Sequence, residues 1–196
     1  RFINFKIKMI KIGLTGSIAS GKTTASKIIS RRRGPLFSAD DVVKKLYTKK
    51  NFKKAVVKKL KLKSRSDFKR TIKNIILKKK RTLEKLEKII HPMVRKEMLI
   101  FLKKNKNKKF LFLEIPLLIE SKLTKYFDVI IFIRSKRNLR LKRFRLKKGN
   151  IKLFSILDNH QLKDAKKMKL CDHIVVNNKS LTILKKNLLN IIKLYE

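Results

Sequence analysis

The chain has 196 residues with 43% hydrophobic content, which fits one α/β domain with elaborations and a real buried core, and makes a multidomain enzyme unexpected. Its single cysteine, Cys171, excludes an intrachain disulfide framework and fits a reducing compartment, and its three histidines are too scattered for a zinc site. The net charge of +43 invites a nucleic-acid interpretation, but the lysines are spread over the whole chain without a base-stacking aromatic platform, so we expect no specific nucleic-acid partner.

The beginning of the chain does not read as a signal segment. Residues 1–8 have charges between their apolar residues and no small-residue cleavage site. Met9 directly precedes the first expected strand, so it is a candidate natural start, and the role of residues 1–8 stays open. No apolar run approaches the roughly 18 residues of a membrane span, since even 110–119 is interrupted by Glu114. We therefore expect a cytoplasmic protein without a membrane partner.

A phosphate-binding loop follows the first expected strand, Met9–Thr15. The pattern G-x-x-x-x-G-K-[ST] is met by Gly16, Gly21, Lys22 and Thr23, and a helix is expected from Lys22 to about Arg32. The alternative is a glycine-rich turn with a solvated lysine. Three of the five glycines of the chain lie in the nine residues 13–21, which favours the functional interpretation.

The residue types in this loop follow from what a triphosphate needs. Glycine reaches the backbone angles that turn N–H groups toward an anion, and the following helix adds its unpaired N–H groups. Lys22 is expected to reach the β- and γ-phosphates, and the Thr23 hydroxyl to ligate Mg²⁺. The predicted ATP-binding residues of the loop are Gly16, Ala19, Ser20, Gly21, Lys22, Thr23 and Thr24.

A second short strand, Leu36–Ser38, is expected after Gly34 and Pro35, and Asp40 follows its end. The carboxyl edge of an open parallel sheet carries the ligands, so Asp40 and the phosphate loop are expected to face one crevice. The alternative role for Asp40 is to cap the helix that begins near Val42, which Asp41 could equally do.

The rest of the chain alternates between helical and strand patterns. Residues 42–104 show helical spacing, interrupted at His91 and Pro92, with a further helix over Met93–Leu102. The later expected elements are the buried strands 110–115, 129–133 and 174–176 and an amphipathic closing helix, 180–195. This order predicts an α/β fold with a five-stranded parallel sheet flanked by helices.

Five ordered motifs resemble the signatures of the dephospho-CoA kinase family: GLTGSIASGKTT at 13–24, SAD at 38–40, HP at 91–92, IPLLIE at 115–120 and CDHIVVNN at 171–178. The resemblance runs from about Lys11 to the closing helix. It implies a P-loop kinase fold and transfer of the γ-phosphoryl of ATP, with Mg²⁺, to the ribose 3′-hydroxyl of dephospho-CoA, the last step of CoA synthesis. It also implies one domain, 9–196, with a core (9–41, 108–135, 170–196), a helical substrate-binding insertion (42–107) and a lid (136–169).

The resemblance also implies site roles. Asp40 falls on the second aspartate of the family's Asp-x-Asp motif and would be the base for the attacking hydroxyl, which suits phosphoryl transfer. Arg143 falls on a lid arginine that neutralises transition-state charge, and Asn177 on a contact near the adenine. The acceptor-side residues by position are His91, Pro116, Leu117, Leu118 and Glu120, although Pro116 could equally end a strand and Glu120 cap a helix. Gln161, Lys167 and Asp172 also fall on family positions, and Glu114 takes the strand end where a carboxylate orients the metal.

Four residues depart from the family pattern. Ser38 replaces the first aspartate of Asp-x-Asp, Ser17 and Ala19 replace loop glycines, and Lys147 replaces a lid arginine. The serine at position 38 removes a charge beside the expected base. Ser17 and Ala19 each carry a Cβ, so each is expected to adopt a negative φ or to leave the loop backbone strained. Two other functions stay open: another small-molecule P-loop kinase, acting on a nucleoside, nucleotide or sugar acid, and a basic nucleic-acid-binding P-loop protein.

Overall fold

The protein forms a five-stranded, fully parallel sheet with helices on both faces. The computed structural model describes residues 9–62, 67–79 and 81–196, so the question of residues 1–8 lies outside the described part. The strands are β1 (Ile10–Thr15), β2 (Leu36–Ser38), β3 (Phe110–Glu114), β4 (Val129–Arg134) and β5 (His173–Val176). Their order in the sheet is β2-β3-β1-β4-β5, with every neighbouring pair parallel. The predicted fold class is confirmed.

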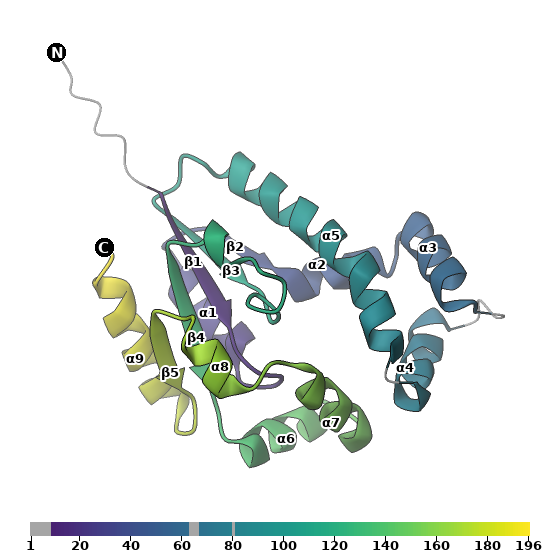
Figure 1. The fold of residues 1–196 in the computed structure, drawn as a ribbon. Helices are drawn as coiled ribbons and strands as arrows, with labels where there is room; N and C mark the ends of the chain where they lie inside the picture. The colour runs from purple at the N-terminus through teal and green to yellow at the C-terminus, as the bar shows by residue number, and fades with distance from the viewer. Residues whose placement is uncertain (1–8, 63–66, 80) are drawn as a thin grey trace.

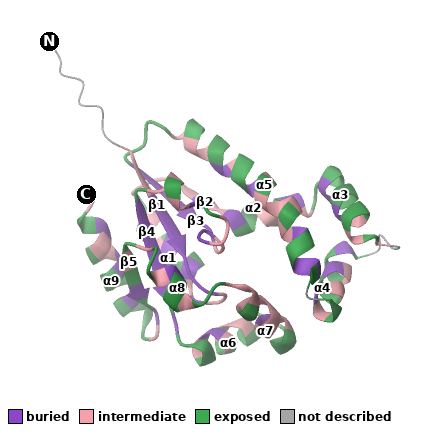
Figure 2. Cartoon of the chain, in the orientation of Figure 1, coloured by how far each residue is buried: buried purple, intermediate pink, exposed green. Residues whose placement is uncertain are grey.

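Strands β1, β3 and β4 are buried on both faces, which explains their apolar runs. The expected buried strand at 174–176 forms as β5, but it lies at the edge of the sheet with Val175 buried and Ile174 and Val176 exposed, so the expectation of burial on both faces is wrong there. Phe110 and Phe112 of β3 pack in one cluster with side chains of α1 (Lys22–Ser30) and α9 (Leu181–Lys193). Leu111 and Leu113, which point to the opposite face, pack in a second cluster with α2 (Ala39–Leu46) and α5 (Arg81–Lys104). Figure 2 shows the strands largely buried while the outward faces of the surrounding helices are exposed.

The predicted helical region is confirmed and consists of four described helices. After α2 come α3 (Lys50–Leu60) and α4 (Phe68–Lys78), and the long α5 returns the chain to the sheet. Helices α3 and α4 lie at the end of the molecule away from β5 and α9 (Figure 1). The Tyr47 ring packs 5.3 Å from the Phe52 ring and 5.7 Å from the Phe68 ring, centroid to centroid, so aromatic contacts join α3 and α4 to the end of α2.

The predicted interruption at His91 and Pro92 is wrong. Helix α5 is continuous from Arg81 to Lys104, with Pro92 inside it. An interior proline lacks an N–H donor and costs about 3 kcal/mol. Leu86 before the proline and Val94 and Met98 after it are all buried in the same cluster, and burial of such side chains contributes about 1.5–3 kcal/mol each. Packing on both sides of Pro92 therefore outweighs the missing hydrogen bond.

A chain of short helices connects β4 to β5. It consists of α6 (Arg137–Leu146), α7 (Ile151–His160) and α8 (Asp164–Met168), and the short 3₁₀ helix η1 (Thr124–Tyr126) lies between β3 and β4. Helices α6 and α7 lie beside the sheet end where β1 meets α1 (Figure 1). Within the described residues, no helix is both long and apolar enough to cross a membrane.

Candidate active site

The loop between β1 and α1 has the backbone shape that its glycines predict. Gly16 and Gly21 have φ of 147° and 101°, values at which side chains are strained. A Cβ on Gly16 would lie 2.4 Å from the Ile133 carbonyl oxygen, and one on Gly21 would lie 2.2 Å from Nδ2 of Asn177. Gly16 is therefore required by its backbone angle and by the nearby carbonyl, whereas Gly21 is required by its backbone angle, since the atom nearest to a Cβ there belongs to a side chain.

The two loop departures differ in cost. Ala19 has a φ of 57° and so occupies the left-handed region, whereas Ser17 is not among the described residues with positive φ. The expected strain is therefore confined to Ala19, where it is of the order of 1–2 kcal/mol for a residue with a Cβ.

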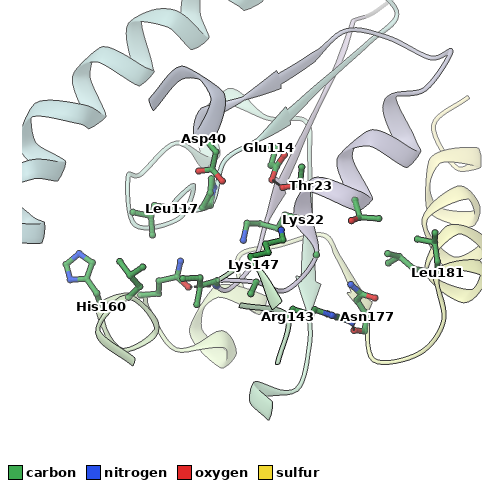
Figure 3. A pocket seen from close by; sticks show the side chains of 18 of the residues that line it. Lys22, Thr23, Asp40, Glu114, Leu117, Arg143, Lys147, His160, Asn177 and Leu181 are labelled. Carbon is green, nitrogen blue, oxygen red and sulfur yellow. Dashed lines mark hydrogen bonds between the residues drawn. The ribbon is translucent and has the colours of Figure 1, made fainter. Parts of the chain in front are cut away.

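A cavity of about 630 Å³ opens beside the loop at the carboxyl ends of the strands. It brings together residues that are far apart in the sequence, from the loop, α2, the end of β3, α6 and the segment after β5 (Figure 3). The predicted site residues that line it are Ala19, Gly21, Lys22, Thr23, Thr24, Asp40, Pro116, Leu117, Arg143 and Asn177. Lys147 and Glu114 line it as well.

Lys22 is buried at the centre of this cavity. Its Nζ donates a hydrogen bond to the Ser17 carbonyl oxygen over 2.9 Å, and only 7% of the residue is exposed. Burial lowers the pKa of Lys22 to about 8, and the Asp40 and Glu114 carboxylates partly oppose this shift. The ammonium is thus poorly solvated, a state that an entering phosphate would relieve.

Thr23 and Glu114 form an oxygen-rich group beside Lys22. The Thr23 hydroxyl donates to Oε1 of Glu114 over 2.6 Å, and Oγ of Ser26 lies 3.1 Å from Oε2 of the same carboxylate. No group of three or more His, Cys, Asp or Glu side chains within the described ranges is arranged to hold a metal. The pair instead suits Mg²⁺, which uses one or two protein oxygens and takes its remaining ligands from water and phosphate.

Asp40 is not a helix cap. Helix α2 begins at Ala39, and its cap is Ser38, whose Oγ accepts a hydrogen bond from the Asp41 N–H over 3.2 Å. The alternative that Asp40 or Asp41 caps this helix is therefore wrong. The Asp40 carboxylate is exposed and points into the cavity that also holds Lys22, as Figure 3 shows. Asp41 instead pairs with Lys44 over 2.7 Å.

Arg143 extends from α6 to the loop and to the end of β5. Its guanidinium donates to the Asn177 carbonyl oxygen over 2.9 Å, to the Ser135 hydroxyl over 3.1 Å and to the Ser20 carbonyl oxygen over 3.3 Å. Asn177 in turn donates from Nδ2 to the same Ser20 oxygen over 2.8 Å. These bonds bring α6, the phosphate loop and the residue after β5 together at the edge of the cavity.

Five predicted site residues lie outside the cavity lining. Gly16 and Ser20 lie in the base of the loop, and the side chain of Leu118 is fully buried. Oε1 of Glu120 lies 2.8 Å from Nζ of the fully buried Lys167 and also accepts from the Leu162 N–H. His91 lies in a second depression on α5, where burial lowers its pKa.

The sequence interpretation missed a histidine and a glutamate in the cavity wall. Nε2 of His160, at the end of α7, lies 2.8 Å from Oε2 of Glu87 on α5, and both residues line the cavity. Leu83 and Leu157 line the same wall. The two polar residues are 73 positions apart in the sequence, and no local pattern indicates that their helices meet.

The chain is similar to known proteins over nearly its whole length. The family model of dephospho-CoA kinase matches residues 10–182. The dephospho-CoA kinase of Rickettsia typhi is 32% identical over 190 residues, covering 94% of this chain and 97% of that protein. The dephospho-CoA kinase of Fusobacterium nucleatum is 33% identical over 178 residues, covering 87% of this chain and 90% of the relative.

Solved structures give the same result at the level of the fold. A dephospho-CoA kinase structure from Campylobacter jejuni has a TM-score of 0.63 and 25% identity, covering 95% of this chain and 96% of that chain. A shikimate kinase from Acinetobacter baumannii, 12% identical with a TM-score of 0.57 over 96% and 93% of the two chains, shares the fold alone. With the family model matched from β1 to the start of α9 and relatives above 30% identity over most of both chains, this chain belongs to the dephospho-CoA kinase family.

Proposed function

We propose that this chain transfers the γ-phosphoryl group of ATP to the ribose 3′-hydroxyl of dephospho-CoA, giving CoA and ADP. The observation that carries the proposal is the placement of the Asp40 carboxylate in the cavity that also holds Lys22 and Thr23. A phosphate cradle and a carboxylate across one cavity are what an in-line transfer to an alcohol requires.

The donor end of the cavity is assigned to ATP. The loop N–H groups and Lys22 bind the phosphates, and Lys22 leaves the Ser17 carbonyl oxygen to do so. A magnesium ion, when bound, neutralises phosphate charge, and the Thr23 hydroxyl with Glu114 would hold it. Arg143, which lines the cavity, would contribute positive charge near the transferred group, and Asn177, which also lines it, would contact the adenine.

The acceptor end is assigned to dephospho-CoA. Asp40 orients the attacking hydroxyl and accepts its proton as the new oxygen–phosphorus bond forms and the bond to ADP breaks. Pro116 and Leu117 form part of the wall for the acceptor. We also assign His91, Leu118 and Glu120 to the acceptor side, although they do not line the cavity. Glu120 would act by holding Lys167 and the segment after α7.

We also propose how the chain is divided into functional regions and in which compartment the protein works. Residues 42–107 form the substrate-binding insertion, 136–169 the lid, and the remaining part of 9–196 the core, in a protein that works in the cytoplasm.

Cys171 is half-buried, and burial raises its pKa to about 11. Both observations support the proposal that this cysteine is an unreactive packing residue.

The test is an acceptor assay with the purified chain and Mg²⁺-ATP. Dephospho-CoA is offered beside shikimate, deoxyadenosine and gluconate, and the products are identified by mass spectrometry. We expect CoA from dephospho-CoA and no phosphorylated product from the others. Lys22→Ala should abolish turnover through lost phosphate contacts, while Lys193→Ala, a lysine change at an exposed position at the end of α9, serves as the matched control. Phosphorylation of another acceptor without CoA formation would show a different small-molecule kinase.

The same assay tests the nucleic-acid alternative. DNA or RNA is added across a range of salt concentrations, because binding through Lys and Arg weakens steeply with salt. We expect no stimulation of ATP turnover by either polymer. Stimulation of ATP turnover without formation of CoA would favour the nucleic-acid-binding alternative.

A further inference from the structure

The tip of the phosphate loop is held by side chains from the region between β4 and β5. The Ser17 hydroxyl donates to Oδ1 of Asp164, at the start of α8. Oε1 of Gln161 accepts from the Ile18 N–H over 3.0 Å, and the Arg140 guanidinium donates to the Ile18 carbonyl oxygen over 3.3 Å. Two consecutive loop residues thus have side-chain partners more than 120 positions away in the sequence.

The loop needs such contacts because part of it is strained. Ala19 adopts a φ of 57°, which a residue with a Cβ rarely takes. Strained backbone persists only where the surrounding structure fixes it. The contacts at Ser17 and Ile18 directly precede the strained residue and supply that restraint.

Ser17 connects Asp164 to the phosphate-binding lysine. Its hydroxyl donates to Asp164, and its carbonyl oxygen accepts from Nζ of Lys22 over 2.9 Å. The residue is only 3% exposed, so a hydroxyl without a partner there would be unfavourable. In the ligand-free loop, Ser17 thus contacts both the Asp164 carboxylate and the Lys22 ammonium.

The charged groups that most affect the pKa of Lys22 are Asp40, Glu114, Lys167 and Arg140. The direct contact between Asp164 and the loop is the hydrogen bond from the Ser17 hydroxyl.

We propose that Asp164 is a positioning residue for nucleotide binding, acting through the Ser17 hydroxyl to keep the phosphate loop in its anion-binding shape. The Ser17 side chain makes this contact possible, since a glycine at this position would have no hydroxyl to donate. The inference rests on the proposed function only in that the loop binds the phosphates of a nucleotide.

The test is a double-mutant cycle on the full chain, with Asp164→Ala, Ser17→Gly and both together. Calorimetry measures the dissociation constant for Mg²⁺-ATP. We expect Asp164→Ala to weaken ATP binding about tenfold, in line with the loss of a charge-assisted hydrogen bond. In the Ser17→Gly background the same change should weaken binding less than about twofold, because the donor is already absent.

Two further variants separate this role from simple destabilisation. Asp164→Asn keeps an acceptor oxygen, so it should restore binding to within about threefold of the unmodified chain. Glu84→Ala on α5 removes a carboxylate at an exposed position and should leave ATP binding unchanged. Hydrogen exchange at the Ile18 amide, measured without nucleotide, should quicken in Asp164→Ala and stay slow in Glu84→Ala.

Equal effects of Asp164→Ala with and without the Ser17→Gly substitution would overturn the proposal, as would equal loss of binding in Asp164→Asn and Asp164→Ala. The readout is ATP binding and loop exchange, not phosphoryl transfer. A chain that binds ATP in an Asp164-dependent way and forms no CoA would refute the proposed function and support this inference. Formation of CoA, together with additive effects of Asp164→Ala and Ser17→Gly on ATP binding, would support the proposed function and refute this inference.

Discussion

The affinity of the chain for Mg²⁺-ATP should fall as the pH rises from 7 to 9. Burial lowers the pKa of Lys22 to about 8 in the ligand-free protein. With that pKa, about 90% of the Lys22 side chains are charged at pH 7 and about 10% at pH 9. Bound phosphate favours the ammonium, so nucleotide binds the protonated form more tightly. The dissociation constant should therefore rise about tenfold over these two pH units.

Calorimetric titration at constant ionic strength measures this change, and Lys22→Arg is the matched control. The phosphate groups of ATP are almost fully ionised above pH 7, and lysines of ordinary pKa, near 10.4, stay charged up to pH 9. The guanidinium that Lys22→Arg introduces also stays charged, so the affinity of this variant should change less than about twofold. A flat profile in the unmodified chain, or the same slope in Lys22→Arg, would refute the assignment of Lys22 as the titrating phosphate ligand.

The lowered pKa of Lys22 also affects the stability of the folded chain. The pKa of Lys22 is lower in the folded chain than the ordinary value of 10.5, so below pH 8 both states are charged and the desolvation penalty is fully present. As the pH rises from about 8 to 10.5, the folded state loses this proton while the unfolded state keeps it. The free energy of unfolding should therefore increase, by an amount on the order of 3 kcal/mol at most. Urea unfolding of the unmodified chain against Lys22→Met isolates this contribution from the general repulsion among the surface lysines.

Three other substitutions test separate parts of the site. Asp40→Asn should lower kcat by about 10²–10⁴ while ATP binding stays within about twofold, and a near-normal kcat would remove Asp40 from the base role. Ala19→Gly should relieve the left-handed strain and raise the free energy of unfolding by about 1 kcal/mol, and a lower melting temperature would show that Ala19 is not strained. His160→Ala should raise KM for dephospho-CoA by about fivefold and KM for ATP by less than twofold, because it breaks the contact with Glu87 in the wall away from the loop. Equal changes in the two KM values would place His160 outside the acceptor site.

The parts of the fold that could be predicted are those encoded by local patterns. The strand that ends at Thr15, the glycines at 16 and 21 and the helix from Lys22 all lie within one continuous segment, so backbone constraints and motif coincide. Runs buried on both faces, such as 110–114, predict strands because almost every residue is apolar. The gathering of Asp40 and Lys22 in one cavity followed from a general rule, since parallel strands place their carboxyl ends at one edge.

The parts that could not be predicted depend on contacts between distant segments. The pair of His160 and Glu87 and the contact of Asp164 with Ser17 each join residues more than 70 positions apart. A single sequence contains no signal for such pairings, because each residue alone reads as an ordinary polar position on a helix or loop. Pro92 illustrates the same limit, since its local effect is to end a helix and only the buried side chains on both sides of it keep α5 continuous.

Ser38, at a position where the sequence resemblance leads us to expect an aspartate, has a structural role at the start of α2. Serine and aspartate are both good helix caps, so replacing the aspartate of the family pattern leaves the start of α2 intact. Because Ser38 accepts from the Asp41 N–H, the helix begins at Ala39, and Asp40 falls in the first turn with its carboxylate toward the cavity. A cap at Asp40 itself would instead hold that carboxylate against its own backbone. The cap at Ser38 therefore leaves the Asp40 carboxylate free to face the cavity, and a serine at position 38 keeps this arrangement without a second carboxylate.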